Sequence, residues 1–350
     1  MKVLLGVGYY EPGGFSTVLN MLSKHLQKYD IEVVVAARVI RMQAPQFVKL
    51  IKLTPREFVS EGKKYDVIHI HTSYPYTRAV IKYGLADKVV FTWHGYAPLK
   101  YVPGLQNKVT GFYIKHIGYK SLLPKIKYIT AISEYARQQL KELYGVDAVV
   151  IPNGVDLHLF NRCSSINPDE KYGSYKPIIF NATAYNKLKG GDLLIKYFKV
   201  IKRRFPQALL MAVGIQRYIK NLSDGYKHSI VNLDVMSFEE LVKYYCISHF
   251  YLLTSRIESF GLPIIESFAA GKPVIALDKP DARREHIVGS GAGFLFRSEE
   301  ELLSAVDEVL SNYDYLSRKA VEYAKNFDWD VVAKQYIKIY KGVLDEQTRS

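Results

Sequence analysis

The sequence predicts two doubly wound α/β domains, and three observations carry this prediction. The chain has 350 residues, about twice the length of one ordinary domain. In both halves, short apolar segments alternate with stretches of helical length, the pattern of parallel strands buried between crossover helices. A polar, turn-rich stretch separates the two series, so residues 161–175 are the expected linker.

Six apolar runs predict the strands of the first domain. They cover residues 2–7, 31–35, 66–71, 88–94, 128–132 and 148–151. A Pro-Gly-Gly turn follows the first run, and apolar residues then recur at helical spacing from Val18 to Leu26. The first domain is therefore expected to span residues 1–163.

The second half repeats this rhythm. Its expected strands are residues 177–180, 208–213, 250–253, 273–276 and 293–296, and its clearest helical patterns are residues 192–205 and 299–310. We expect the second domain to cover residues 164–330. Residues 331–350 are expected to form a helix that packs back toward the first domain.

Composition limits the class of protein. The chain is 48% hydrophobic, 13% aromatic and 23% charged, which supports packed cores and excludes a disordered chain. Its two cysteines, Cys163 and Cys246, exclude a disulfide framework and a cysteine-rich metal site. No apolar run approaches the roughly 20 residues of a membrane span, and residues 2–7 are too short for a signal-peptide core. These features predict a soluble, intracellular protein.

Positive charge is concentrated in the first half. Lys and Arg number 48 against 34 Asp and Glu, a net charge of +14, of which residues 1–165 carry +11. Residues 88–133 contain seven lysines and no carboxylate. This asymmetry favours an anionic partner for the first domain. The alternative is a solvated basic face on a heat-adapted or merely basic protein.

Glycine pairs and histidines fall where the predicted strands end. Gly13 and Gly14 follow the first strand, His71 and His94 close two others, and Lys189 precedes a second glycine pair. Ligands of doubly wound sheets bind at these carboxyl ends, where a glycine lets a phosphate reach backbone amides. A tight turn explains a lone glycine pair equally well. The chain has neither the dinucleotide fingerprint nor a P-loop.

Residues 256–274 carry the densest chemical signal. Pro263 suits the first turn of a helix, which would leave three backbone amides at the helix mouth free for an anion. These amides belong to Phe260, Gly261 and Leu262. Glu258 precedes the mouth, and Glu266 lies inside the apolar helix, where a carboxylate needs hydrogen-bond donors such as sugar or ribose hydroxyls. The alternative is two ordinary glutamates, one of which caps a helix.

Together these motifs resemble the retaining glycosyltransferases of family 4, which have the GT-B fold: two Rossmann-like, doubly wound domains facing an interdomain cleft. Glu258 and Glu266 match the Glu-x7-Glu element of that family. Further similar segments are residues 66–71, 92–95, 151–156, 238–241 and 270–274. The resemblance extends from residue 1 to about residue 340.

The resemblance implies a nucleotide-diphosphate sugar as donor, with UDP or GDP as carrier and no metal ion. Glu258 would contact sugar hydroxyls, the amides of Phe260, Gly261 and Leu262 the diphosphate, and Glu266 the ribose. Gly14 would let its loop approach the phosphate, His94 would lie beside the donor sugar, and Lys189 would neutralise the leaving diphosphate. His94 could instead be a core histidine, and we expect His69 and His71 to be structural.

The sequence departs from the family at one point. The family usually has a Gly-Arg pair shortly before the Lys-Gly, and its arginine is a second cation for the diphosphate. Thr183 or Ala184 stands at that position here. Lys187 or Arg217 could substitute, although a lysine lacks the guanidinium fork.

The first domain would bind a hydroxyl acceptor, either lipid-linked or a glycan, and nucleic acid is not the expected partner. Residues 100–128 mix lysines with apolar and aromatic residues, which predicts a helix attracted to an anionic membrane from the cytoplasmic side. A core-facing helix with a wet basic side is the alternative. Competing activities are a sugar-nucleotide epimerase, a phosphorylase, which is normally far longer, and a non-catalytic binding protein on a transferase scaffold.

Overall fold

The structure, a computed structural model, describes residues 1–96, 98–101, 104–166, 172–183, 186–220 and 222–348. The chain forms two compact units, described separately below: Met1–Gly154 with Trp329–Ser350, and Val155–Asp328. The first division lies earlier than the expected residue 163. At Gly154 an added Cβ would lie 2.5 Å from the Trp329 ring, so this glycine lets the last helix close onto the first unit.

The first unit contains a parallel sheet of seven strands in the order β3-β2-β1-β4-β5-β6-β7. The strands are β1 (Lys2–Tyr10), β2 (Glu32–Ile40), β3 (Lys49–Lys52), β4 (Val67–His71), β5 (Val89–Trp93), β6 (Tyr128–Ala131) and β7 (Val149–Val150). The sequence analysis missed β3, a four-residue strand at the sheet edge without a fully buried side chain. The strand order reverses between β1 and β4.

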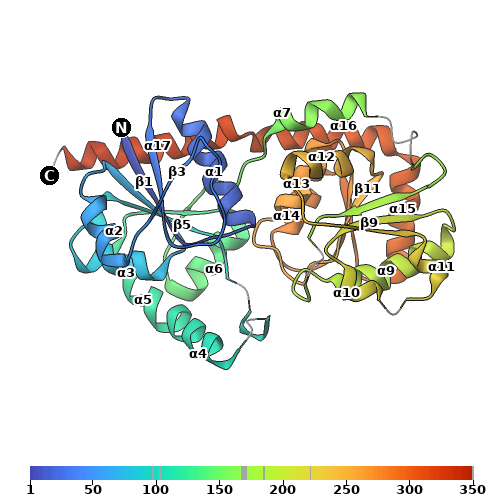
Figure 1. Cartoon of the computed structure of the whole chain (residues 1–350), viewed down its shortest axis with the longest axis horizontal. Coiled ribbons are helices and arrows are strands. Elements are labelled where there is room, and N and C mark those ends of the chain that lie inside the picture. The colour runs from blue at the N-terminus through green and yellow to red at the C-terminus, as the bar shows by residue number, and fades with distance from the viewer. Residues whose placement is uncertain (97, 102–103, 167–171, 184–185, 221, 349–350) are drawn as a thin grey trace. The chain divides into compact units, whose positions relative to one another are not determined.

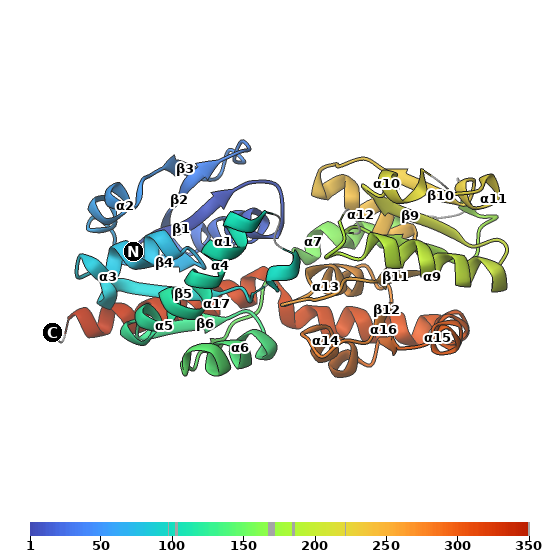
Figure 2. The ribbon, with the colours of Figure 1, turned by 90° about the horizontal axis from the view of Figure 1, so that it is seen from below.

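Helices cover both faces of this sheet. They are α1 (Gly14–Gln27), α2 (Pro55–Gly62), α3 (Tyr74–Lys82), α4 (Leu105–Tyr113), α5 (Tyr119–Leu122), α6 (Glu134–Tyr144) and α17 (Trp329–Gln347). α1, near the start of the chain, packs with α17, the C-terminal helix that is red in Figure 1. α3 packs with α2 and α5, as Figure 2 shows. α4 lies at the margin of the unit (Figure 1) and has no buried residue.

The second unit contains a parallel sheet of six strands in the order β10-β9-β8-β11-β12-β13. The strands are β8 (Ile178–Asn181), β9 (Leu209–Val213), β10 (Ile230–Leu233), β11 (Phe250–Leu253), β12 (Val274–Leu277) and β13 (Gly293–Phe296). The unpredicted strand, β10, is again a short, half-buried edge strand. The order reverses between β8 and β11, so both units confirm the predicted doubly wound fold.

Two layers of helices enclose the second sheet. The helices are α7 (Leu157–Phe160), α9 (Gly191–Arg204), α10 (Gln216–Ile219), α11 (Asp224–Lys227), α12 (Phe238–Ile247), α13 (Leu262–Ala269), α14 (Arg283–Ser290), α15 (Glu299–Ser311) and α16 (Tyr313–Ala324). α9 and α15 share one apolar core with the strands. α12, α13 and α14 lie on the other side of the sheet in Figure 1.

Cys163 and Cys246 form a disulfide. The two cysteines rule out a framework of several bridges, as predicted, but not this single bond. It joins the 3₁₀ turn Asn161–Ser165 to α12. The expected linker therefore begins with residues fastened to the second unit, and residues 167–171 of it lie outside the described residues.

Within the described ranges, no helix is both long and apolar enough to cross a membrane.

Candidate functional site

Glu258 and Lys189 meet at the point where the second sheet reverses its strand order. Lys189 lies in the loop after β8, and Glu258 lies in the loop after the neighbouring strand β11. The Lys189 Nζ donates to both Glu258 carboxylate oxygens, at 2.9 and 3.2 Å. Burial alone would raise the pKa of Glu258, which is only 5% exposed, but the charge and hydrogen bond of Lys189 outweigh it and lower the pKa. The Glu258 carboxylate is therefore ionised at neutral pH.

A buried ion pair holds the Glu258 backbone in place. The Glu258 N–H donates to Asp281 Oδ2 at 2.9 Å. The Arg283 guanidinium, fully buried, donates to both Asp281 oxygens at 2.7 and 2.8 Å. Its remaining N–H groups reach the carbonyls of Leu277 and Ser255 at 2.7 and 2.8 Å. Each of the three guanidinium nitrogens thus donates a hydrogen bond, as a buried charge requires.

The loop that carries Lys189 is fixed by close backbone contact. Gly190 has φ 74°, and a Cβ there would lie 2.0 Å from the Thr254 carbonyl oxygen, so only glycine fits. The Arg256 guanidinium donates to both Asp192 carboxylate oxygens at 2.8 and 2.6 Å. This second ion pair joins the loop after β11 to the first turn of α9, which directly follows the loop of Lys189.

The mouth of α13 has the geometry that the sequence predicts. Gly261 is the N-cap with φ 93°, and Pro263 lies in the first turn. Among the described residues, no acceptor receives a hydrogen bond from the backbone N–H groups of Phe260, Gly261 or Leu262. Gly261 and the Phe260 side chain are buried and Leu262 is half-buried. Unused amides at a helix N-terminus can bind an anion.

Glu266 projects from α13 toward α12. The Tyr245 hydroxyl donates to its Oε2 at 2.6 Å, and burial raises the pKa of Glu266 to about 7 despite this hydrogen bond. Burial also raises the pKa of Tyr251, and the charges of Glu258 and Glu266 both add to that rise. The two carboxylates therefore lie in one region of the second unit, around Tyr251.

The first unit gathers Gly14, Phe15 and His94 at the carboxyl end of its sheet. Gly14 is exposed and begins α1 directly after the Gly13 N-cap, whose φ is 144°. His94 follows β5, and its ring lies 4.5 Å from the ring of Phe15, which is 43% exposed. Burial lowers the pKa of His94 to about 3, so its imidazole is neutral at physiological pH.

His69 and His71 lie on the same face of β4, because side chains two positions apart share a face. His69 is satisfied in the core: its ring nitrogens contact the Tyr340 hydroxyl at 2.7 Å and Thr92 Oγ1 at 2.6 Å. His71 Nδ1 instead lies 2.9 Å from His94 Nε2. The expectation of a structural role thus suits His69, whereas His71 contacts a candidate site residue.

The substitutes suggested for the missing arginine are exposed. Arg217 extends over the ring of Tyr218, and the backbone carbonyl of Lys187 accepts from Arg256. Thr183 Oγ1 lies 3.2 Å from the Tyr251 hydroxyl. Ala184 lies outside the described residues. Lys189 is thus the cation that the structure places against Glu258.

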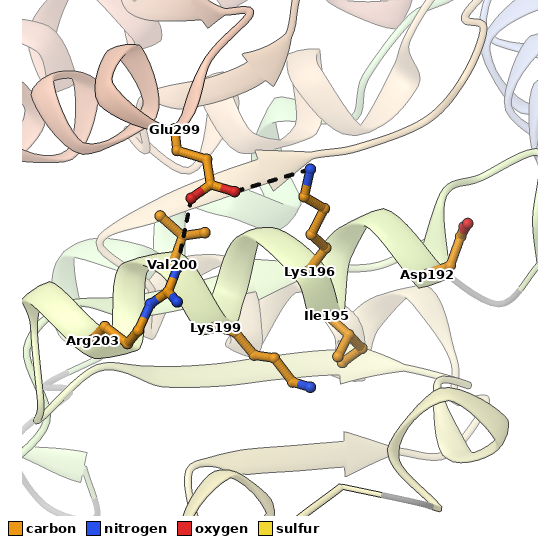
Figure 3. A pocket seen from close by; sticks show the side chains of 7 residues that line it. All are labelled: Asp192, Ile195, Lys196, Lys199, Val200, Arg203 and Glu299. Atoms are coloured by element: carbon orange, nitrogen blue, oxygen red, sulfur yellow. Dashed lines mark ion pairs between the residues drawn. The ribbon is translucent and has the colours of Figure 1, made fainter.

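A separate hollow of about 380 Å³ lies along α9 (Figure 3). Its charged side chains face one another: Glu299 lies 4.0 Å from Lys196 and 3.6 Å from Arg203. It contains none of the predicted site residues, so we assign it no part in the site. In the described parts of the chain, no cluster of His, Cys, Asp and Glu could hold a metal ion.

Comparison with protein families identifies the family of this chain. Residues 12–159 match the model "Glycosyltransferase Family 4", and residues 166–327 match "Glycosyl transferases group 1". The two matches follow each other along nearly the whole chain. The chain is a family 4 glycosyltransferase of the GT-B fold.

Known proteins similar to this transferase agree with the assignment. It is 25% identical over 312 residues to a phosphatidyl-myo-inositol mannosyltransferase of Mycolicibacterium smegmatis, covering 82% of this chain and 74% of that one. It is 25% identical over 298 residues to an uncharacterized glycosyltransferase of Methanocaldococcus jannaschii, covering 82% and 78%.

Solved structures share the fold of the transferase. A glycosyltransferase from Rickettsia africae has a TM-score of 0.74 at 22% identity and covers 98% of both chains. The Anabaena protein HepE, in complex with UDP and glucose, has a TM-score of 0.74 at 17% identity, over 97% of this chain and 98% of that one.

Sequence reasoning assigned no role in the site to five residues that lie around it. They are Phe15, His71, Tyr245, Asp281 and Arg283. Each acts through a contact between segments distant in the chain, which no local pattern reveals. Arg283 lies in the charged segment 281–286 of the sequence, which gives no sign that its side chain is buried.

Proposed function

We propose that this transferase moves a hexose from a UDP- or GDP-sugar to a hydroxyl acceptor, lipid-linked or a glycan, with retention of configuration and without a metal ion. Similar proteins support both substrate classes: one is a phosphatidyl-myo-inositol mannosyltransferase, and HepE has been solved in complex with UDP-glucose. The donor would bind mainly to the second unit and the acceptor to the first.

The observation that carries this proposal is the Lys189–Glu258 pair, together with the amides at the start of α13 that have no hydrogen-bond acceptor among the described residues. When a nucleoside diphosphate leaves, negative charge develops on its oxygens. Protein groups stabilise such charge when they are already in place before the reaction. We assign this role to the charge of Lys189 and to the amide dipoles of Gly261 and Leu262. Glu258 would accept hydrogen bonds from sugar hydroxyls, and Glu266 from the ribose.

Retention would follow from attack on the face that the diphosphate leaves. The bond between the anomeric carbon and the diphosphate oxygen breaks, and the acceptor oxygen bonds to that carbon. The acceptor proton passes to the departing diphosphate oxygen, so no protein nucleophile is needed. His94 would contact the donor sugar through a hydrogen bond, because a neutral imidazole can donate or accept.

A thermal-shift panel of nucleoside diphosphates and their sugar derivatives tests the donor class. Ligand binding to the native state raises the melting temperature by mass action. We expect nucleotides with one particular base to raise the melting temperature, and the matching nucleotide sugar to raise it further. Glu258→Gln should reduce this further increase. A melting temperature that no nucleotide changes would contradict the proposal. The exposed Glu322→Gln, which lies on α16, is a matched control for the lost charge.

Turnover assays separate this activity from its alternatives. With donor and acceptor together, a transferase releases nucleoside diphosphate, and the anomeric configuration of the product can be read by NMR. An epimerase would convert the nucleotide sugar without an acceptor. A non-catalytic binding protein would show the thermal shift but neither product.

We further propose that α4 docks the transferase on an anionic membrane at the cytoplasmic face. The exposed fractions of Leu105, Val109, Phe112 and Ile117 are 79%, 62%, 52% and 55%. The alternative of a core-facing helix is therefore wrong. Apolar side chains among lysines, without a carboxylate in residues 88–133, match a bilayer surface with acidic headgroups.

A further inference from the structure

Two neutral histidines share a hydrogen bond at the end of the first sheet. His71 ends β4 and His94 follows the neighbouring strand β5. His71 Nδ1 lies 2.9 Å from His94 Nε2. Burial lowers the pKa of His94 to about 3 and the pKa of His71 well below its ordinary value. One of the two facing nitrogens therefore carries the proton and the other is bare.

The surroundings of His71 decide which ring donates. His71 Nε2 is buried and has no hydrogen-bond partner among the described residues. If His94 donated, the single proton of His71 would lie on this nitrogen, as a buried N–H without an acceptor. In the opposite arrangement, only a bare nitrogen lacks a partner. Buried N–H groups without acceptors are the rarer and costlier case, so His71 donates and His94 keeps its proton on Nδ1.

Thr72 fixes the spacing of the two strand ends. It has φ 42°, a left-handed conformation that is unfavourable for a β-branched residue. Its N–H and Oγ1 both donate to the Thr92 carbonyl, at 3.1 and 2.9 Å. Its Oγ1 also accepts from the His94 N–H at 3.0 Å. The backbone on both sides of the histidine pair is thus held by one side chain.

We propose that His71 is a positioning residue that sets the tautomer of His94, so that His94 presents an N–H at Nδ1. His94 Nδ1 contacts no polar group in the described part of the chain, and the Phe15 ring lies against the imidazole. This N–H would donate to an oxygen of the donor sugar. The identity of that oxygen rests on the proposed function, whereas the proton arrangement rests on the geometry of the pair.

His71→Asn and His71→Leu test the donated hydrogen bond. The Asn amide places an N–H near the position of His Nδ1, whereas Leu fills space without donating. We expect His71→Leu to lower kcat about 10- to 100-fold, the usual cost of losing a partner that fixes a histidine tautomer, with the donor KM little changed. His71→Asn should restore most of the rate. If Asn is as slow as Leu while both remain folded, the proposal is overturned.

A double-mutant cycle tests whether His71 acts through His94. In a His94→Ala background, His71→Leu should cost no further rate, because the coupled residue is absent. Independent losses that multiply would overturn the proposal. His228→Asn, at an exposed position of the second unit, is the control and should leave the rate unchanged.

Long-range ¹H–¹⁵N NMR spectra of ¹⁵N-histidine-labelled protein read the tautomer directly. The His94 signals, assigned by their loss in His94→Ala, should show protonated Nδ1 and bare Nε2 in the wild type and in His71→Asn. In His71→Leu they should show a mixture. A protonated Nε2 in the wild type would overturn the proposal. Because this measurement needs no substrate, it still decides the role of His71 if no donor is turned over, a result that would contradict only the proposed function.

Discussion

The Tyr245 hydroxyl lies 2.6 Å from Oε2 of Glu266. Glu266 belongs to α13, a helix made mostly of apolar residues. This contact joins α12 to α13 and uses one carboxylate oxygen. Among the described residues the other oxygen, Oε1, has no hydrogen-bond partner. A ribose hydroxyl could donate to this oxygen. We therefore expect both the stability of the protein and its affinity for the nucleotide to depend on whether Glu266 is protonated.

The raised pKa of Glu266 predicts a loss of stability with rising pH. The native state holds this proton up to about pH 7, whereas the unfolded state releases it near 4.5. The contribution of Glu266 to the free energy of unfolding is complete below pH 4.5 and is lost as the pH rises to 7. Because Glu266 is half-buried, we expect Glu266→Gln to gain about 2 kcal/mol relative to wild type over this range. Urea unfolding from pH 4.5 to 7.5 measures it, and parallel curves for the two proteins would contradict it.

Lys189→Ala should destabilise the second unit by about 3 kcal/mol, because it leaves the buried carboxylate of Glu258 without a counter-charge. Lys189→Met with Glu258→Gln removes both charges and should recover most of that stability, yet remain inactive. Urea unfolding and donor turnover measure the two effects. A double variant as unstable as Lys189→Ala would show that the ion pair is not the source of the loss.

His94→Ala should lower turnover about a hundredfold or more, as removal of one transition-state hydrogen bond does. Binding of the nucleoside diphosphate should change little, because the proposed contact is to the sugar. Steady-state kinetics and calorimetric titration with the diphosphate separate the two. Loss of both together contradicts this role for His94.

Val109→Ser with Phe112→Ser should abolish sedimentation with anionic vesicles. Both side chains are exposed, so the folded protein and its turnover of a water-soluble acceptor should be unaffected. Val235→Ser, at an 84% exposed position of the second unit, is the control. Binding that is equal for neutral and anionic vesicles would refute the charge-dependent docking.

Breaking the Cys163–Cys246 disulfide should lower the free energy of unfolding. The bond closes a loop across a sequence separation of 83 residues, and loop-closure entropy for this length is about 4 kcal/mol. Cys163→Ala with Cys246→Ala should lose an amount of this order. A reductant should destabilise the wild type but not the double variant. Equal sensitivity of both proteins to reductant would contradict a stabilising bond.

Local sequence patterns predict the architecture of this protein. Apolar runs of strand length, separated by helical periodicity, predicted the two doubly wound domains, because buried parallel strands must be apolar on both faces. Pro263 and Gly261 marked the mouth of α13, because their backbone preferences are local. The edge strands β3 and β10 were not predicted, because a short, half-exposed strand has no distinctive sequence pattern.

Sequence motifs alone also selected Gly14, His94, Lys189, Glu258 and Glu266 as the candidate site. Tertiary structure decided what surrounds them: His71 against His94, Tyr245 against Glu266, and Asp281 with Arg283 behind Glu258. Hydrogen bonds and burial shift pKa values only between atoms a few ångströms apart. Residues far apart in the chain reach that distance only when the sheets and helices pack, so partners and protonation states had to come from the folded chain.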